Sequence, residues 1–194
     1  MFYIPNGVDF EHFYKSDKKI PEDLKKIPKP IAIYVGSIDE WFGIDFLLSV
    51  AKKCKDVSFV IIGSPNIDIT ILKSVSNLFL LGKKDYSEVP KYIYNSDVGI
   101  IIFNTIHPLV QFVNPIKLYE YMACGKPVIA TSWKELELLK SPAYLADSVD
   151  DFINGLKSSL RNKGMESELI QFAKDHSWKV SFEKIINILN LKTS

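Results

Sequence analysis

The stretch NPIKLYEYMACGKPVIAT, residues 114–131, combines a short helical pattern with an apolar strand. Asn114 is suited to cap the helix, Pro115 to occupy its first position and Gly125 to end it. The apolar run that begins at Pro127 follows directly, so a tight turn joins the helix to the strand. Such a unit, repeated along a chain, is typical of an α/β fold.

Short apolar runs alternate with amphipathic segments over the whole sequence. The predicted strands are 31–36, 57–63, 78–82, 98–103, 127–131 and 143–146. Most are apolar on both faces, as buried parallel strands are. Helical patterns span 42–54, 86–96, 115–124, 149–162, 167–174 and 178–191, with a weaker one at 67–76. This order predicts an α/β fold with a Rossmann-like, doubly wound parallel sheet of about six strands.

Composition narrows the class of protein. The chain has 194 residues, of which 47% are hydrophobic, enough for one sizeable core. Its formal net charge of +1, with both signs spread evenly, argues against a nucleic-acid partner. Cys54 and Cys124 lack metal-ligand spacing, so we expect reduced core thiols and no metal site. No apolar run reaches the roughly 20 residues that span a bilayer, and no signal-peptide pattern is found, so a cytoplasmic location is expected.

Three predicted strands end in glycine, at Gly36, Gly63 and Gly82. In open parallel sheets ligands bind outside the carboxyl ends of the strands, so we expect a site at this edge. Glycine is also required in tight turns without any ligand, and both interpretations stay open. The segment GSIDEWFG after the first strand lacks the G-x-G-x-x-G pattern, and no G-x-x-x-x-G-K-[ST] loop occurs. NAD enzymes and P-loop NTPases are therefore disfavoured.

Lys117 and Glu120 share one face of the helix predicted at 115–124. Another face is expected to pack on the sheet through Ile116, Tyr119, Met122 and Ala123. A lysine in the first turn opposes the helix dipole unless an anion such as phosphate lies there. Glu120 could accept hydrogen bonds from two ribose hydroxyls. The alternative is an exposed ion pair of little consequence, and the residues alone leave both open.

The same stretch resembles the P-x-K-x-x-E-Y-x-A-x-G-K-P-V element in the donor-binding half of GT-B glycosyltransferases of family 4 type. IPNGVDFEHF (4–13) resembles the linker that enters this second domain, and YVGSIDEWFGID (34–45) resembles its first strand and loop. Ser177 and Trp178 resemble the start of its C-terminal helix. GSIDEWF followed by NPIKLYEY resembles bacterial polysaccharide and cell-wall transferases in particular. The resemblance implies a lead-in at 1–30, a donor domain at 31–165 and C-terminal helices at 166–194.

In that family the glutamate at the position of Glu120 holds the ribose of a nucleotide sugar. The resemblance places the base beside the loop at 82–85, and the diphosphate against Gly36, Ser37 and the start of the 115–124 helix. It implies a UDP- or GDP-sugar as substrate, with no cofactor and no metal. The implied donor-binding residues are Gly36, Ser37, Gly82, Lys83, Asn114, Lys117, Leu118 and Glu120.

Three positions depart from the family pattern. Phe112 stands where the family has an acidic contact to the sugar, Ser37 where an arginine is common, and Phe42 where a lysine is common. Lys117 and backbone amides are therefore expected to neutralise the diphosphate, together with the dipole of the 115–124 helix. Lys83 and Lys84 are weaker candidates for this role.

Catalysis is expected to need more than this chain. The resemblance implies an N-terminal acceptor domain that carries the group activating the acceptor, so the chain alone should transfer no sugar. His107, in the loop after the fourth strand, is a weaker candidate for a contact with the leaving group. The full-length protein could associate peripherally with the inner face of the membrane. Two alternatives stay open: a sugar-nucleotide epimerase of the same fold, and a non-catalytic interaction module.

Overall fold

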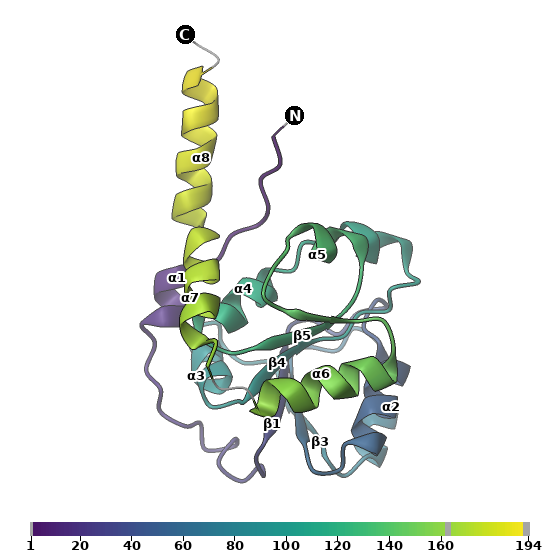
Figure 1. Ribbon diagram of the computed structural model, residues 1–194. Helices are drawn as coiled ribbons and strands as arrows, with labels where there is room; N and C mark the ends of the chain where they lie inside the picture. The colour runs from purple at the N-terminus through teal and green to yellow at the C-terminus, as the bar shows by residue number, and fades with distance from the viewer. Residues whose placement is uncertain (1, 162–163, 192–194) are drawn as a thin grey trace.

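A parallel sheet of six strands forms the centre of the protein in the computed structural model, which describes residues 2–161 and 164–191. The strand order is β3-β2-β1-β4-β5-β6 (Figure 1). The strands are β1 (Ile31–Val35), β2 (Ser58–Ile62), β3 (Leu78–Gly82), β4 (Val98–Ile101), β5 (Val128–Thr131) and β6 (Tyr144–Ala146). Each lies within a range predicted from the sequence. The Rossmann-like, doubly wound sheet is therefore confirmed.

Helices cover both faces of the sheet (Figure 1). On one face α2 and α6 contact each other, and on the other α4 contacts α1 and α7. The helices are α1 (Phe10–Tyr14), α2 (Ile44–Lys53), α3 (Val89–Tyr94), α4 (Ile116–Ala123), α5 (Lys134–Leu138), α6 (Val149–Arg161), α7 (Glu166–Asp175) and α8 (Trp178–Leu191), with 3-10 turns η1 (Thr70–Ser74) and η2 (Pro108–Phe112). The segment predicted as a weak helix forms only η1, which buries Leu72 alone and so gains little from packing.

The lead-in at 1–30 folds onto the domain. Asp9 caps α1 by accepting the His12 amide, and the aromatic rings of Phe10 and Phe13 are buried in the core. Further along, the lead-in also buries Leu24. Helix α1 was not predicted because five residues are too few to show a helical period. Its burial places the N-terminal segment beside α4.

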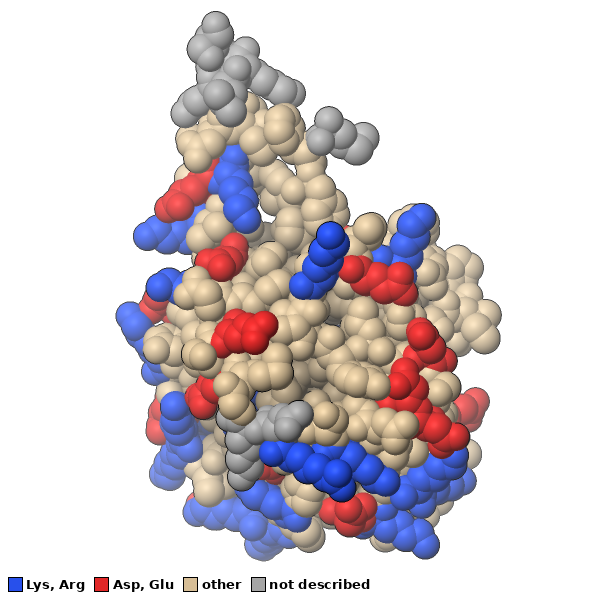
Figure 2. Space-filling view, in the orientation of Figure 1, with Lys and Arg blue, Asp and Glu red and all other residues tan. Residues whose placement is uncertain are grey.

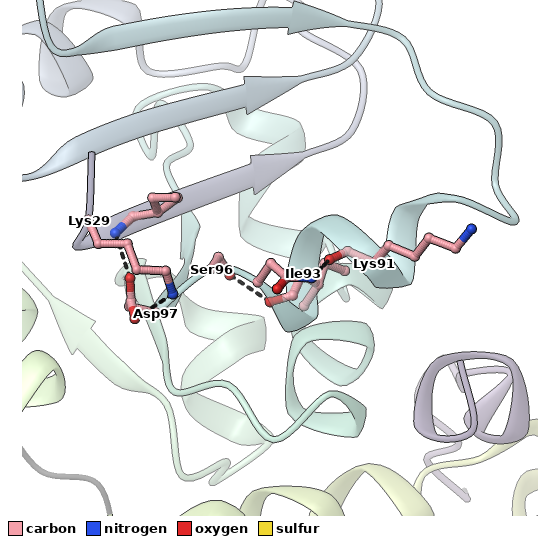
Figure 3. A network of polar contacts seen from close by, with 7 residues as sticks. Lys29, Lys91, Ile93, Ser96 and Asp97 are labelled. Atoms are coloured by element: carbon pink, nitrogen blue, oxygen red, sulfur yellow. Dashed lines mark hydrogen bonds and ion pairs between the residues drawn. The ribbon is translucent and has the colours of Figure 1, made fainter. Parts of the chain in front are cut away.

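The amino ends of β1 and β4 are joined by one carboxylate. Asp97 accepts the backbone amide of Ile31 at 2.8 Å and lies 3.4 Å from Nζ of Lys29 (Figure 3). Nearby, the Ser96 hydroxyl donates to the carbonyl of Ile93 at 2.8 Å, which closes the turn after α3. These bonds fix the end of the sheet opposite the predicted site.

Three further observations concern the cysteines, the length of the helices and the surface charge. Cys54 and Cys124 are free and buried, as the sequence predicts. Over the described ranges, every helix is too short or too polar to cross a membrane. Basic and acidic side chains are interspersed on the face shown in Figure 2.

Candidate functional site

The loops that follow β1, β2 and β3 are bonded to one another. The Gly36 amide donates to the carbonyl of Ile62 at 2.9 Å, and the Gly63 amide donates to that of Gly82 at 3.0 Å. A Cβ atom on Gly63 would lie 1.8 Å from the carbonyl oxygen of Gly36. Glycine at position 63 is therefore required by the close approach of two loops, which is the structural interpretation.

Gly36 faces a side chain from another element. A Cβ atom on Gly36 would lie 3.0 Å from Nζ of Lys117, and the φ angle of +149° is one that other residues rarely adopt. Helix α4 thus directs the lysine of its first turn onto the backbone of the loop after β1. The structure brings together these two residues, which the sequence assigned to one site.

Lys117 is held against aromatic rings. Its ammonium lies 4.7 Å from the ring centre of Tyr34 and 4.8 Å from that of Phe103, and donates to the Tyr34 hydroxyl at 3.4 Å. That hydroxyl donates in turn to the carbonyl of Ser37 at 2.8 Å. Burial lowers the pKa of Lys117 to about 8, although the charges of Glu120 and Asp39 act to raise it. A desolvated ammonium without an ion pair to any described carboxylate favours the arrival of an anion.

Glu120 lies one helical turn further along α4. Burial raises the pKa of its carboxyl to about 7, and the charge of Lys117 lowers it in part. The two side chains are too far apart for an ion pair, so the alternative of an exposed, paired lysine and glutamate is wrong. The pKa of Tyr86 is raised to about 12, chiefly by burial and then by the charge of Glu120. Glu120 therefore lies near Tyr86, in the loop that follows β3.

The start of α4 differs from the prediction. Pro115, and not Asn114, is the cap residue, and no side chain caps the helix. The amide of Asn114 is already bonded to Tyr3 and Tyr119, so it is not available to the helix amides. Ile116, which was expected in the core, is 40% exposed.

Leu118 is a further correction to the predicted site. Its side chain is fully buried on the sheet, and its amide donates to the carbonyl of Pro115 at 3.1 Å. It therefore packs the helix instead of facing a ligand. The geometry of a helix start leaves the preceding amides, those of Ile116 and Lys117, without acceptors inside the helix. These two amides and the ammonium of Lys117 together suit an oxyanion.

The lysines after β3 divide into two kinds. Lys83 is exposed beyond Gly82, in the loop that the resemblance places beside a base. Lys84 instead forms an ion pair of 2.7 Å with Asp23 and lies above the ring of Tyr92. Lys84 is thus bound to the lead-in, which removes it as a candidate for phosphate.

The positions that depart from the family pattern lie in different surroundings. Phe42 is buried against Tyr34, so it fills the core where the family has a lysine. Phe112 is 81% exposed on η2 and presents a ring where the family has a carboxylate. His107 packs edge-on against Trp41, and its Nδ1 is enclosed without a hydrogen-bond partner among the described residues. A role for His107 at a leaving group stays a prediction.

Sequence reasoning missed the aromatic residues around the site. Tyr34 was visible as a hydroxyl near the carboxyl end of an otherwise apolar strand, but its bond to Lys117 depends on the fold. The Tyr86 ring stacks on His12 at 4.4 Å, and its carbonyl lies 3.1 Å from Nε2 of that histidine. No signal in the sequence connects residues 74 positions apart.

Two pockets lie at opposite edges of the sheet. One of about 770 Å³ lies at the carboxyl edge over α2, where Phe42 and Phe103 contribute to its wall. Another of about 750 Å³ lies at the amino end, near Lys29 and Asp97. Lys117, which is half-buried, lines neither of these two pockets.

Known proteins support a family assignment. One relative is TuaH of Bacillus subtilis (strain 168), which is described as a putative teichuronic acid biosynthesis glycosyltransferase. It is 26% identical over 202 residues, and the match covers 97% of this chain and 50% of TuaH. The uncharacterised glycosyltransferase MJ1178 of Methanocaldococcus jannaschii is 25% identical and covers 79% of this chain and 45% of its own length. The chain therefore spans about half the length of the curated relatives it matches.

Solved structures share the fold. HepE of Anabaena, in complex with UDP and glucose, superposes with a TM-score of 0.76 at 17% identity, over 96% of this chain and 56% of HepE. Sucrose-phosphate synthase of Thermosynechococcus elongatus gives a TM-score of 0.74 at 18% identity, over 98% of this chain and 52% of the enzyme. Residues 29–162, well over half of the chain, match the family model described as glycosyl transferases group 1. The chain therefore belongs to the glycosyl transferases group 1 family.

Proposed function

We propose that this chain is the donor half of a glycosyltransferase and that it binds a UDP- or GDP-sugar. One observation carries the proposal. Lys117, with a pKa lowered by burial, meets the backbone of Gly36, while Glu120, with a pKa raised by burial, lies one turn further on. Neither group has an ion-pair partner among the described residues, and partial burial of such groups is costly unless a ligand supplies the partners.

A nucleoside diphosphate supplies both partners. Its phosphate oxygens would accept from the ammonium of Lys117 and from the amides at the start of α4, beside Gly36 and Ser37. Its ribose hydroxyls would donate to the carboxylate of Glu120. Its base would then lie by the loop after β3, next to Gly82 and Lys83. HepE, a protein of the same fold, was solved in complex with UDP and glucose, which supports a nucleoside diphosphate as the kind of ligand.

The reaction follows from the placement. The bond between the sugar and the diphosphate breaks, the acceptor oxygen forms the new glycosidic bond, and the nucleoside diphosphate leaves with additional negative charge. Lys117 and the helix start would stabilise that charge without a metal ion or a cofactor. The alternatives of an epimerase and of an inert module predict, respectively, sugar interconversion without an acceptor and no nucleotide binding.

The remaining half of the protein would supply the acceptor site. Helix α8 rises above the body of the domain (Figure 1) and exposes the apolar side chains of Trp178, Phe182 and Ile185. Such an exposed stripe on one helix suits a packed protein partner. We assign this surface to the N-terminal acceptor domain of the full-length protein. Without the acceptor domain to position an acceptor, the isolated chain should not transfer sugar.

The wider role rests on similarity to TuaH. A transferase of this kind would build a bacterial polysaccharide of the cell wall. Because nucleotide sugars are made in the cytoplasm, we place the protein there, with peripheral contact of the full-length enzyme to the inner face of the membrane.

Calorimetry tests the proposal with this chain. UDP, GDP and their sugars are titrated against it, with uridine and guanosine as controls that lack phosphate. Binding of at least one diphosphate, tighter than its nucleoside, is expected. Absence of binding by all of them would contradict the donor-site assignment and favour the interaction module.

A further inference from the structure

Asn114 precedes the first turn of α4 and forms hydrogen bonds through both atoms of its side-chain amide and through its backbone carbonyl. Its Nδ2 donates to the hydroxyl of Tyr3 at 3.1 Å and to Oε1 of Glu135 at 3.3 Å. Its Oδ1 accepts from the hydroxyl of Tyr119 at 3.1 Å. Its backbone carbonyl accepts from Nδ2 of Asn6 at 2.8 Å. With both ends of its amide engaged, Asn114 holds neighbours in place instead of binding a ligand.

Two of the partners of Asn114 come from the N-terminal end of the chain. Tyr3 and Asn6 lie in the N-terminal segment, which is also paired with the junction of α7 and α8. There the Val8 amide donates to the carbonyl of His176 at 3.0 Å, and the Trp178 amide donates to that of Val8 at 3.1 Å. Figure 1 shows this segment rising next to α8. The segment is thus bound at two points, one of them at the start of α4.

The start of α4 depends on such outside support. The helix has only eight residues and no capping side chain. The carbonyl of Val113, one residue earlier, accepts from Nε1 of the buried Trp133 at 2.9 Å. The two carbonyls before the proline cap are therefore each held by a side chain from outside the helix, Trp133 at one and Asn6 at the other.

We infer that Asn6 and Tyr3 are positioning residues for the diphosphate: they hold Asn114 and so fix the amides and the lysine at the start of α4. The inference rests on the proposed function. Phosphate recognition by a helix start needs its amides to point at the ligand, and a displacement of about 1 Å can cost on the order of a hundredfold in a well-oriented site. Glu120 is less dependent on these bonds to Asn114. The adjacent buried residue, Tyr121, anchors the next turn because its hydroxyl accepts the Val35 amide at 2.8 Å.

The hydrogen bonds that Asn6 and Tyr3 make with Asn114 can be removed without damage to the core. Asn6 and Tyr3 are exposed, so their substitution removes hydrogen bonds and little packing. Asn6→Ala and Asn6→Asp both remove the amide that donates to Asn114, whereas Asn6→Gln keeps a donor. Tyr3→Phe removes the hydroxyl alone. Matched controls are Asn95→Ala, which removes similar bonds to the carbonyls of Lys18 and Lys91 far from the site, and Tyr14→Phe on α1.

The experiment compares UDP or GDP with uridine or guanosine by calorimetry on the 194-residue chain. Asn6→Ala and Asn6→Asp, which lose one hydrogen bond, should each weaken diphosphate binding by about three- to tenfold and leave nucleoside binding within about twofold. Tyr3→Phe, which loses the bonds of the hydroxyl with both Asn114 and Glu135, should weaken diphosphate binding by at least as much. Asn6→Gln and both controls should match wild type.

Three results would overturn the inference. Unchanged diphosphate affinity in Asn6→Asp would show that the bond to Asn114 has no role in binding. Equal weakening of diphosphate and nucleoside would indicate general loosening of the domain. If the wild type binds no nucleotide, the proposed function fails and this inference with it, whereas binding by wild type with no change in the variants rejects the inference alone.

Discussion

The ammonium of Lys117 lies 3.4 Å from the hydroxyl of Tyr34, and that hydroxyl donates to the carbonyl of Ser37. Burial raises the pKa of Tyr34 well above its usual range, so the hydroxyl keeps its proton. The chain of bonds aligns Lys117 with the loop after β1 without neutralising its charge. A bound anion would complete the arrangement.

Replacing Lys117 with Met should stabilise the empty domain at neutral pH. The folded-state pKa, about 8, is lower than the ordinary value of 10.5, so folding opposes protonation of this lysine. The penalty is fully present below pH 8 and is lost as pH rises toward 10.5. Urea unfolding of both proteins should show a higher midpoint for Lys117→Met at pH 7 and a smaller difference at pH 10. A lower midpoint for the variant at pH 7 would show that the lysine supports the fold.

Glu120→Gln should respond to pH with the opposite sign. The folded-state pKa, about 7, exceeds the ordinary value of 4.5, so ionisation of this carboxyl opposes folding. The penalty is present above pH 7 and disappears as pH falls to 4.5. The variant should therefore be the more stable protein at pH 8 and match wild type near pH 4.5. Equal unfolding midpoints at pH 8 would argue that Glu120 is well solvated.

Glu120→Ala should weaken binding of every nucleotide that the wild type binds. Loss of a charged acceptor for the ribose hydroxyls should cost about 1.5 to 3 kcal/mol, with the nucleoside and the diphosphate affected alike. Calorimetry with 2′-deoxy nucleotides provides the control, since they lack one of the two hydroxyls. A variant with wild-type affinity would end the ribose assignment.

Affinity for a nucleotide sugar should pass through a maximum between about pH 7 and 8. Below that range Glu120 takes up a proton and loses acceptor strength, and above it Lys117 loses its charge. The diphosphate of a nucleotide sugar does not titrate there, so the profile reports on the protein. Lys117→Met should lose the alkaline decline and keep the acidic one. A wild-type profile that is flat from pH 6 to pH 9 would contradict both assignments.

The isolated chain should bind a donor and transfer nothing. A transfer reaction needs the acceptor held in near-attack geometry, and the relatives are about twice as long as this chain. In the full-length protein, Phe182→Glu on α8 should lower transfer more than donor binding, because it disturbs the surface assigned to the acceptor domain. Sustained glycosylation by the 194 residues alone would show that they contain an acceptor site.

The strands were predictable because their apolar runs are long enough and are bounded by glycine and polar residues. The placement of Lys117 and Glu120 one turn apart on α4 also followed from spacing, since a helix aligns residues three apart. The cap of α4 was not predictable. Asn114 has the right chemistry for a cap, but a tyrosine 111 positions earlier in the chain engages its amide.

Distance along the chain explains the other errors too. The sequence made Lys84 a candidate for binding phosphate, but in the folded protein Asp23 lies 2.7 Å from its ammonium. Leu118 was included with its neighbours, although its place on the helix directs it to the sheet. Local patterns therefore specified the elements and the edge that carries the site, while tertiary contacts decided which side chains are free to bind.

The most direct test is a set of four titrations, in which UDP or GDP and the matching nucleoside are each titrated into wild type and into Lys117→Met. The substitution should weaken diphosphate binding by about 1.5 to 3 kcal/mol, since one charge-assisted contact is lost, and leave nucleoside binding nearly unchanged. Added salt should reduce diphosphate binding more in wild type than in the variant. Equal weakening of both ligands, or of neither, would contradict the claim that Lys117 neutralises a bound diphosphate.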